Sequence, residues 1–491
     1  MLKKLLSQTV IYGAGHILAK LLNVLLTPLL TDVSGFERAE YGIFSEFYAY
    51  VAFINIVLIF GMETTFFRFV RDADDPKKVY NQAFVWVGLM GVAFLALMLP
   101  FRDVVAGWLG YGDQGYWLML LSVVIFLDVL AAMPLALLRH KGMPGRYALI
   151  LIVNVVITLT LNFIFLIVLG WQDLTWVFVA NLSASAVKFL LSLWGNLPSS
   201  LKLDRSTLGP MLNYAFFIMI AGFAGIMNET LDRTLLPKLW PDGALWHGKP
   251  LTGKELNGIY GANYKVAMLI QLAIQAFRYA AEPFFFKESK EKDSPETFAR
   301  VFHYFVIAAL LGFLVIGSFA RELVTFEWFG LFTFIGEDYW VGLEVVPILL
   351  LAYVFAGAYL NLSIWFKITK QVRFAILFTG TGALITILGN VLFIPEYGYL
   401  ASGWATLVCY VVMCVMVYFV GQRYYPIPYR MTRIMLYGVL FIGLYLINRS
   451  IGPAQGYWVA FAVKALLCLV GIGAIVVGEK WFSVFGKKQQ E

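Results

Sequence analysis

Nine charged side chains fall inside apolar stretches of this chain, and their types suggest binding and coupling chemistry. They are Lys20, Glu46, Asp128, Lys188, Lys265, Arg278, Glu282, Glu344 and Lys464. Each charge at the centre of a bilayer costs roughly 2.5–3.5 kcal/mol to insert, so most of them are expected to face a polar interior. Five are cations and four are acids, a balance that suits an anionic ligand. The acids could couple movement to a proton or sodium ion.

The cations differ in how well a structural role explains them. Lys20 lies in mid-span with His16 one turn earlier on the same helix face, too deep to reach the headgroups easily. Lys188 and Lys464 fit a side chain that extends to the membrane surface about as well as a functional one. Lys265 is expected near the outer end of its span.

Two further features concern pairs of charges. Arg278 and Glu282 have the i, i+4 spacing of an intrahelical ion pair, so they either stabilise the helix or serve the ligand. Asp232-Arg233 lies just beyond the outer end of the seventh span, where Arg233 is expected to meet Lys265 at the outer mouth.

Three acids are candidates for ion coupling. Asp128 is isolated in mid-span, and a titratable site and a buried structural pair are equally good interpretations. The predicted ion-coupling residues are Asp128, Glu46 and Glu282.

The elements that must position these charges are membrane-spanning helices. Of 491 residues, 60% are hydrophobic, 14% are charged and 42 are Phe, and the mean hydropathy is +0.78, which excludes a soluble protein. With about 20 apolar residues needed per span, fourteen are predicted. They are expected near 9–30, 42–62, 83–100, 116–138, 148–170, 175–194, 208–228, 263–286, 301–320, 344–366, 374–394, 400–420, 434–447 and 457–478. The distribution of Lys and Arg favours cytoplasmic termini on both ends.

Two distant segments of the chain repeat each other. At a constant offset of 216 residues the identical pairs are Gly42/Gly258, Ile43/Ile259, Tyr48/Tyr264 and Ile54/Ile270. An earlier pair of spans corresponds at an offset of 202, through Tyr12 and Tyr214. Internal repeats of this kind are typical of transporters, whose substrate site lies where the repeats meet.

The sequence offers no sign of a cofactor or a metal. The three cysteines lie in spans without metal-like partners, and the four histidines are scattered. The net charge of +7 is explained by cytoplasmic loops, which suit anionic membrane lipids rather than nucleic acid.

Several motifs, in their order and spacing, resemble polysaccharide exporters of the multidrug/oligosaccharidyl-lipid/polysaccharide (MOP) superfamily, in particular O-antigen flippases. The resemblance covers nearly the whole chain. The motifs are Tyr12-Gly13, Pro28-Leu29-Leu30-Thr31, Glu40-Tyr41-Gly42-Ile43, Leu231-Asp232-Arg233, Tyr264-Lys265-Val266-Ala267 and Asn390-Val391-Leu392-Phe393-Ile394-Pro395. One departure is a long loop, rich in Trp and Pro, between Asp232 and Gly258, which we expect to cover the outer mouth.

The resemblance implies an all-α polytopic membrane protein of about 14 transmembrane helices, with two pseudo-symmetric six-helix lobes and two additional C-terminal helices. The expected boundaries are 1–200, 201–425 and 426–491. It implies a transporter rather than an enzyme, working by alternating access in the bacterial cytoplasmic (inner) membrane. The implied cargo is undecaprenyl-pyrophosphate-linked oligosaccharide, and the implied partners are membrane lipids, a H⁺ or Na⁺ coupling ion and polysaccharide assembly enzymes.

Such a cargo suits the cations, because positive charge at cavity depth offsets the lost hydration of a pyrophosphate, while a tyrosine offers a flat face and a hydroxyl to sugars. The predicted substrate-binding residues are Lys20, Lys265, Arg278, Arg233, His16 and Tyr264.

Two other functions remain open. A cation-coupled multidrug exporter would share the fold and could use Glu46 and Asp128, although the basic balance argues against cationic drugs. A membrane glycosyltransferase or polymerase would need the Asp72-Ala73-Asp74 pair, which lies in a short charged loop without a nucleotide-binding domain. Transport of a peptidoglycan precursor is disfavoured, since the lipid II flippase branch typically carries several arginines in its first two helices, whereas the first helix here has only Lys20 with His16.

Overall fold

The computed structural model describes residues 17, 24–71, 73–241, 243–289, 291–328, 330–369, 371, 373–451 and 457–488. Within them, 11 helices are long and apolar enough to cross a membrane. Large apolar side chains such as Leu97, Val439 and Val477 are well exposed on these helices, as expected for surfaces that face lipid. The predicted all-α polytopic membrane fold is confirmed, and most of the first predicted span, near 9–30, lies outside the described residues.

The N-terminal lobe comprises the helices that precede the linker 194–204. They are η1 (Leu29–Val33), α2 (Arg38–Ile59), α3 (Met62–Arg71), α4 (Pro76–Leu109), α5 (Gly115–His140), α6 (Pro144–Phe163), η2 (Ile164–Val168) and α7 (Leu174–Leu193). Between α2 and α3 the chain kinks at Phe60 and Gly61, both of which have positive φ. The span predicted near 42–62 corresponds to α2, and α3 continues beyond the kink within the candidate membrane span Arg38–Arg71.

The C-terminal lobe and the two added helices follow the linker. They are α8 (Arg205–Leu239), α9 (Gly253–Glu288), α10 (Ser294–Ser318), α11 (Ala320–Thr325), η3 (Glu337–Val345), α12 (Val346–Leu362), α13 (Ile364–Ile368), α14 (Arg373–Tyr424), α15 (Met431–Ser450) and α16 (Tyr457–Lys488). Gly398, at φ 50° and ψ −136°, breaks α14 between the two spans predicted there. The short span near 434–447 extends into its flanks as α15.

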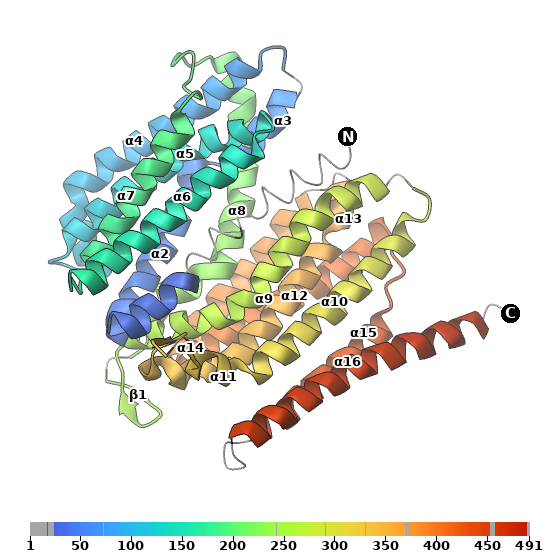
Figure 1. The fold of residues 1–491 in the computed structure, drawn as a ribbon. Coiled ribbons are helices and arrows are strands. Elements are labelled where there is room, and N and C mark those ends of the chain that lie inside the picture. The colour runs from blue at the N-terminus through green and yellow to red at the C-terminus, as the bar shows by residue number, and fades with distance from the viewer. Residues whose placement is uncertain are drawn as a thin grey trace.

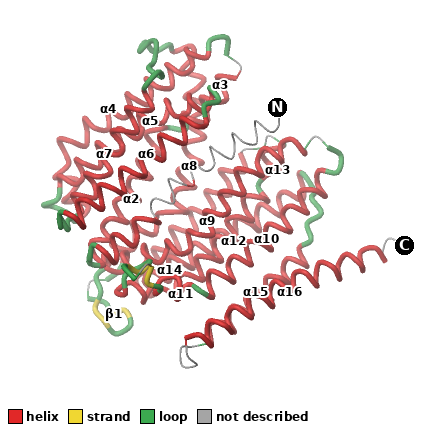
Figure 2. The backbone as a smooth tube through the Cα atoms, in the orientation of Figure 1, coloured by secondary structure: helices red, strands yellow, loops and turns green. Residues whose placement is uncertain are grey.

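Figure 1 shows the two lobes close together at the end that carries β1 and farther apart at the end that carries α3 and α13. We call these the closed end and the open end. The strands are two short hairpins, which Figure 2 places at the closed end. Their strands are β1 (Leu245–Trp246) with β2 (Lys249–Pro250), and β3 (Glu327–Trp328) with β4 (Phe332–Thr333).

The loop expected between Asp232 and Gly258 is mostly helical, which corrects the prediction. Helix α8 continues to Leu239 and α9 begins at Gly253, so only the β1–β2 hairpin and its flanks lie between them. Trp246 of this hairpin donates from Nε1 to the Tyr399 hydroxyl at 3.1 Å, which holds the hairpin against α14. Hydropathy missed both helix extensions because they carry charged residues.

The repeat-related glycines lie against each other where α2 crosses α9 near the closed end. A Cβ built on Gly42 would overlap the backbone oxygen of Lys254, and one on Gly258 would overlap that of Arg38. Asn257 Nδ2 donates to the Gly42 oxygen at 2.9 Å. The two repeated segments of the sequence therefore contact each other where the lobes meet.

Polar contacts of the same end tie the lobes together. Arg38 of α2 lies 2.9 Å from the carboxylate of Asp338 in η3, and the Tyr339 hydroxyl donates to the Phe36 oxygen at 3.0 Å. The β3–β4 hairpin is hydrogen-bonded to η1, since Thr333 N donates to Asp32 Oδ2 at 2.7 Å.

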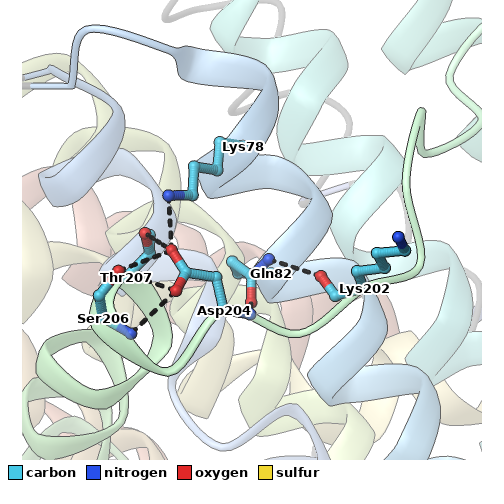
Figure 3. A network of polar contacts seen from close by, with 6 residues as sticks. All are labelled: Lys78, Gln82, Lys202, Asp204, Ser206 and Thr207. Atoms are coloured by element: carbon cyan, nitrogen blue, oxygen red, sulfur yellow. Dashed lines mark hydrogen bonds and ion pairs between the residues drawn. The ribbon is translucent and has the colours of Figure 1, made fainter.

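The linker between the lobes is held against α4 at the open end by hydrogen bonds and an ion pair (Figure 3). Gln82 donates from Nε2 to the Lys202 oxygen at 2.9 Å and accepts from the Asp204 amide at 2.8 Å. Lys78 Nζ lies 2.5 Å from Asp204 Oδ2. Asp204 also caps α8 by accepting from the Ser206 amide. The domain boundaries 1–200, 201–425 and 426–491 remain predictions.

This cap predicts a pH dependence. The Lys78 ammonium, with hydrogen bonds from Ser206 and Thr207, holds the pKa of the Asp204 carboxyl well below its usual range. Because the folded pKa is the lower one, the stabilisation is present above the unfolded pKa of about 3.9 and is lost as pH falls toward the folded value. Thermal unfolding of the wild type and Asp204→Asn should differ by a constant amount from pH 7 to about pH 5 and converge below it. A difference that grows on acidification would contradict this.

Candidate functional site

Arg233, Lys265 and Tyr264 come together in the C-terminal lobe, where α8, α9 and α12 meet. The Arg233 Cζ lies 3.8 Å from the centroid of the Tyr264 ring, and the Tyr264 hydroxyl is hydrogen-bonded to that of Tyr353. The Arg233 charge also acts on the Lys265 ammonium. We call these four residues the cationic cluster. The predicted role of Arg233, Lys265 and Tyr264 in substrate binding remains a prediction.

The location of this meeting differs from the prediction. Arg233 is not beyond the end of its span but inside α8, six residues before Leu239. It lies near the contact between the lobes, because the adjacent Asp232 is hydrogen-bonded to Tyr260, two residues after the Gly258 that contacts α2. The cationic cluster is thus built into the fold rather than placed on a loop at the mouth.

The Arg233 guanidinium retains unused hydrogen-bonding capacity. Its Nε and Nη2 atoms are buried and have no hydrogen-bond partner among the residues that the structure describes. The neighbouring Asp232, which is 3% exposed, accepts from the backbone amide of Arg233 and from the Tyr260 hydroxyl. Lys265 forms no ion pair within the described part of the chain. Buried donors without acceptors are costly, so the cluster can accept an anionic oxygen at low cost.

Sequence reasoning missed Glu229 and Tyr353 as neighbours of the cluster. Gln271 Nε2 donates to Glu229 Oε1 at 2.9 Å, which places an amide and a carboxylate beside the tyrosines. Glu229 falls one residue past the span drawn to 228, and its spacing from Asp232 and Arg233 on one helix would have been a signal. Tyr353 lies in a long apolar span with no feature that could have singled it out.

The other predicted binding residues are not part of this group. Arg278 is exposed on α9 and lies 13 residues from Lys265, about 20 Å along the helix. His16 and Lys20 lie outside the described residues. The side chain of Glu282 does too, so its pairing with Arg278 remains a prediction.

Glu46 is buried in the N-terminal lobe, 1% exposed. Its two carboxylate oxygens accept hydrogen bonds of 2.6 Å from the hydroxyls of Tyr50 and Tyr111. Lys254, at the start of α9, places its Nζ 4.2 Å from the centroid of the Tyr111 ring, and Lys238 of α8 lies 5.4 Å from that of Tyr50. Glu46, a predicted ion-coupling residue, is therefore hydrogen-bonded to two tyrosines whose rings each contact a lysine of the C-terminal lobe.

Asp128 has a partner, which the sequence did not reveal. Lys188 Nζ lies 2.7 Å from Asp128 Oδ1, linking α5 to α7. Lys464 likewise lies 2.6 Å from Glu322 Oε1. The sequence left a structural and a functional role equally open for these two lysines, and the structure adds that each is paired with a carboxylate.

The Asp128–Lys188 pair predicts a stability effect. Lys188→Met would leave the Asp128 carboxylate without its cation, and we expect a loss of about 2 kcal/mol, below the value for a fully buried pair because Asp128 is 27% exposed. Asp128→Asn combined with Lys188→Met should recover most of this loss. Thermal unfolding of the purified variants measures both. Equal stability of the single and double variants would contradict the pairing.

The remaining acid, Glu344, accepts from the Tyr399 hydroxyl at 2.7 Å and lies 3.0 Å from His247 Nε2. Across the described ranges, no group of three or more His, Cys, Asp and Glu side chains could hold a metal ion. The cysteines at 409, 414 and 468 are buried and free.

Two kinds of comparison place the chain among known proteins. A family model described as polysaccharide biosynthesis protein matches residues 3–288. No curated protein sequence matches. Among solved structures, the lipid II flippase MurJ in an inward closed conformation has a TM-score of 0.70 at 12% identity, over 96% of this chain and 99% of that chain.

A multidrug resistance MATE family transporter of the MOP superfamily is also similar. Its inward-facing conformation has a TM-score of 0.62 at 14% identity, over 87% of this chain and 96% of that one. Its outward-facing conformation has a TM-score of 0.58 at 13% identity, over 88% and 96%. At such identities the likeness shows a shared fold. Because the family model matches more than half of its residues, the chain belongs to the polysaccharide biosynthesis protein family.

Proposed function

We propose that this protein is a flippase that moves undecaprenyl-pyrophosphate-linked oligosaccharide from the inner to the outer leaflet of the bacterial cytoplasmic membrane, for cell-surface polysaccharide synthesis. The observation that carries the proposal is the cationic cluster, in which Arg233 has buried donors without acceptors and Lys265 has no acidic partner among the described residues. A pyrophosphate supplies the missing acceptors. The family match supports a polysaccharide precursor as the cargo.

In this mechanism Arg233 and Lys265 replace part of the hydration that the pyrophosphate loses on entering the membrane. Tyr264, whose ring already stacks on Arg233, offers an edge and a hydroxyl to the first sugar. We propose that Lys20, His16 and Arg278 contribute further contacts with the cargo. The polyprenyl tail stays in lipid, since transferring it into a polar cavity would oppose the hydrophobic effect.

Alternating access requires the two lobes to separate at the closed end and to approach each other at the open end. The Gly42–Gly258 contact and the Arg38–Asp338 ion pair are the interactions that must break. With cytoplasmic termini, as the Lys and Arg distribution predicts, the open end faces the cytoplasm, where the cargo is made.

For energy coupling we propose Asp128, Glu46 and Glu282, driven by H⁺ or Na⁺. Protonation of Asp128 would release Lys188 and loosen α5 from α7. Glu46 links ion coupling to the contact between the lobes, because Tyr111 and Tyr50 lie between its carboxylate and two lysines of the C-terminal lobe. Polysaccharide assembly enzymes are the proposed protein partners.

The experiment that tests the function is expression in cells that lack their own undecaprenyl-linked oligosaccharide flippase. We expect restored glycan on the outer face, and loss of that glycan in Lys265→Ala at equal protein level. Resistance to cationic drugs without restored glycan would instead support the multidrug exporter, which has the same fold. Cells making several defined glycans are needed, and failure with all of them would reject the proposal.

A further inference from the structure

A cavity of about 700 Å³ lies between the C-terminal lobe and the two added helices, away from the cationic cluster. It is lined by residues of α10, α11, η3, α12, α15 and α16. Neither the proposed cargo path nor the coupling residues use it. Its lining is partly apolar, through Leu343, Pro347 and Tyr445, and partly charged.

Two arginines of the lining carry charge without a counterion. Arg321 of α11 and Arg449 near the end of α15 are exposed, and neither forms an ion pair with a carboxylate within the described part of the chain. The third cation, Lys464, is already bound to Glu322. Guanidinium groups with free donors favour phosphate oxygens, which they can bind through two parallel hydrogen bonds.

The same lining holds two acceptors that lack donors. Glu322 Oε2 and Asn448 Oδ1 are buried and without a hydrogen-bond partner among the described residues. Asn448 is 1% exposed. Its Nδ2 donates to Ser318 Oγ at 2.6 Å, so Oδ1 remains as an acceptor. A negatively charged oxygen and an amide oxygen together favour an ammonium group, which has three donors.

The place of the cavity indicates where such a ligand would come from. Tyr457 is on its lining and is 52% exposed, and the adjacent Trp458 is 76% exposed. Exposed Tyr and Trp at a helix end are typical of the headgroup level of a membrane. Figure 1 shows this end of α16 near the closed end, on the outside of the C-terminal lobe. The cavity is therefore within reach of membrane lipid.

We propose that this cavity binds the headgroup of an aminophospholipid such as phosphatidylethanolamine. Arg321 and Arg449 bind the phosphate, and Glu322 Oε2 and Asn448 Oδ1 accept from the ammonium. Leu343, Pro347 and Tyr445 contact the glycerol and the first methylenes. A lipid held here fastens α15 and α16 to the lobe. This assignment does not depend on the cargo of the transporter.

Native mass spectrometry of the full-length protein in detergent, with added lipids of matched acyl chains, tests the proposal. We expect phosphatidylethanolamine to be retained at least fivefold more than phosphatidylglycerol, which lacks the ammonium. Phosphatidylcholine, whose nitrogen has no N–H to donate, should also bind at least fivefold less. Retention of all three lipids equally by the wild type would overturn the ammonium contacts without any variant being needed.

The variant Arg321→Ala/Arg449→Ala should reduce retention of phosphatidylethanolamine at least tenfold. Arg102→Ala is the matched control, since Arg102 is a partly exposed arginine of the other lobe, and it should leave retention unchanged. Asn448→Leu should make phosphatidylethanolamine and phosphatidylglycerol bind alike. Unchanged retention in the double arginine variant, with an unaltered thermal midpoint, would overturn the proposal.

Discussion

Replacing Arg233 with alanine is expected to lower glycan export at least tenfold at unchanged protein level. Hydrogen bonds to a charged group contribute about 1.5–3 kcal/mol, and every 1.4 kcal/mol corresponds to about a factor of ten in binding. Arg233 offers two buried donors that no described residue uses. Arg233→Lys keeps the charge but loses the planar fork, so we expect an intermediate defect.

The measurement is outer-face glycan in flippase-deleted cells, read with a lectin and normalised to protein in the membrane. Arg373→Ala is a suitable control, because Arg373 is an exposed arginine of the same lobe at the start of α14. Tyr264→Phe, which keeps the ring under Arg233 and removes the hydroxyl, separates packing from binding. Normal export by a folded Arg233→Ala protein would remove the cationic cluster from the path and leave it a structural role.

The sequence predicted the spans well because insertion into a bilayer is decided locally, by about 20 residues at a time. It failed where the three-dimensional environment offsets a local cost. Helix α8 continues through Glu229, Asp232 and Arg233, since Gln271 and the tyrosines supply polar partners inside the bundle. A hydropathy window sees only the charges and ends the span before them.

The partners of buried charges were the least predictable part of the site. Asp128 and Lys188 lie on different helices, and Glu322 and Lys464 are 142 residues apart. Their pairing depends on which helix faces turn toward each other, and apolar helices without a polar stripe give little information about that. Arg233 and Lys265 were an exception, because both were expected at the outer end of adjacent spans.

The repeat, in contrast, predicted more than its few identities suggest. In a molecule with a pseudo-twofold axis, equivalent residues of the two halves approach each other only near that axis. Gly42 and Gly258 are equivalent by their offset, and their backbones are in contact where α2 crosses α9. Glycine at both positions follows from the approach, since a Cβ on either one would overlap a backbone oxygen of the other helix.

Gly42→Ala is therefore expected to hinder closure of the closed end and to reduce export at least tenfold, more than its cost in stability of about 1–3 kcal/mol would explain. Gly258→Ala should have the same effect, because its Cβ meets the equivalent oxygen of Arg38. A cysteine in place of Ser45, which also lies at this contact, should react faster with an impermeant maleimide in either variant, in a background lacking the native cysteines.

Gly107→Ala is the matched control, since a Cβ there meets nothing within 4 Å, and it should leave export and labelling unchanged. Faster labelling of Ser45→Cys together with lost export would make the glycine contact the outer gate. Unchanged labelling with lost export would mean that the helices still close and that the contact acts only through stability, which the thermal midpoint of each variant measures independently. The repeat would then indicate the symmetry of the fold but not the site of its conformational change.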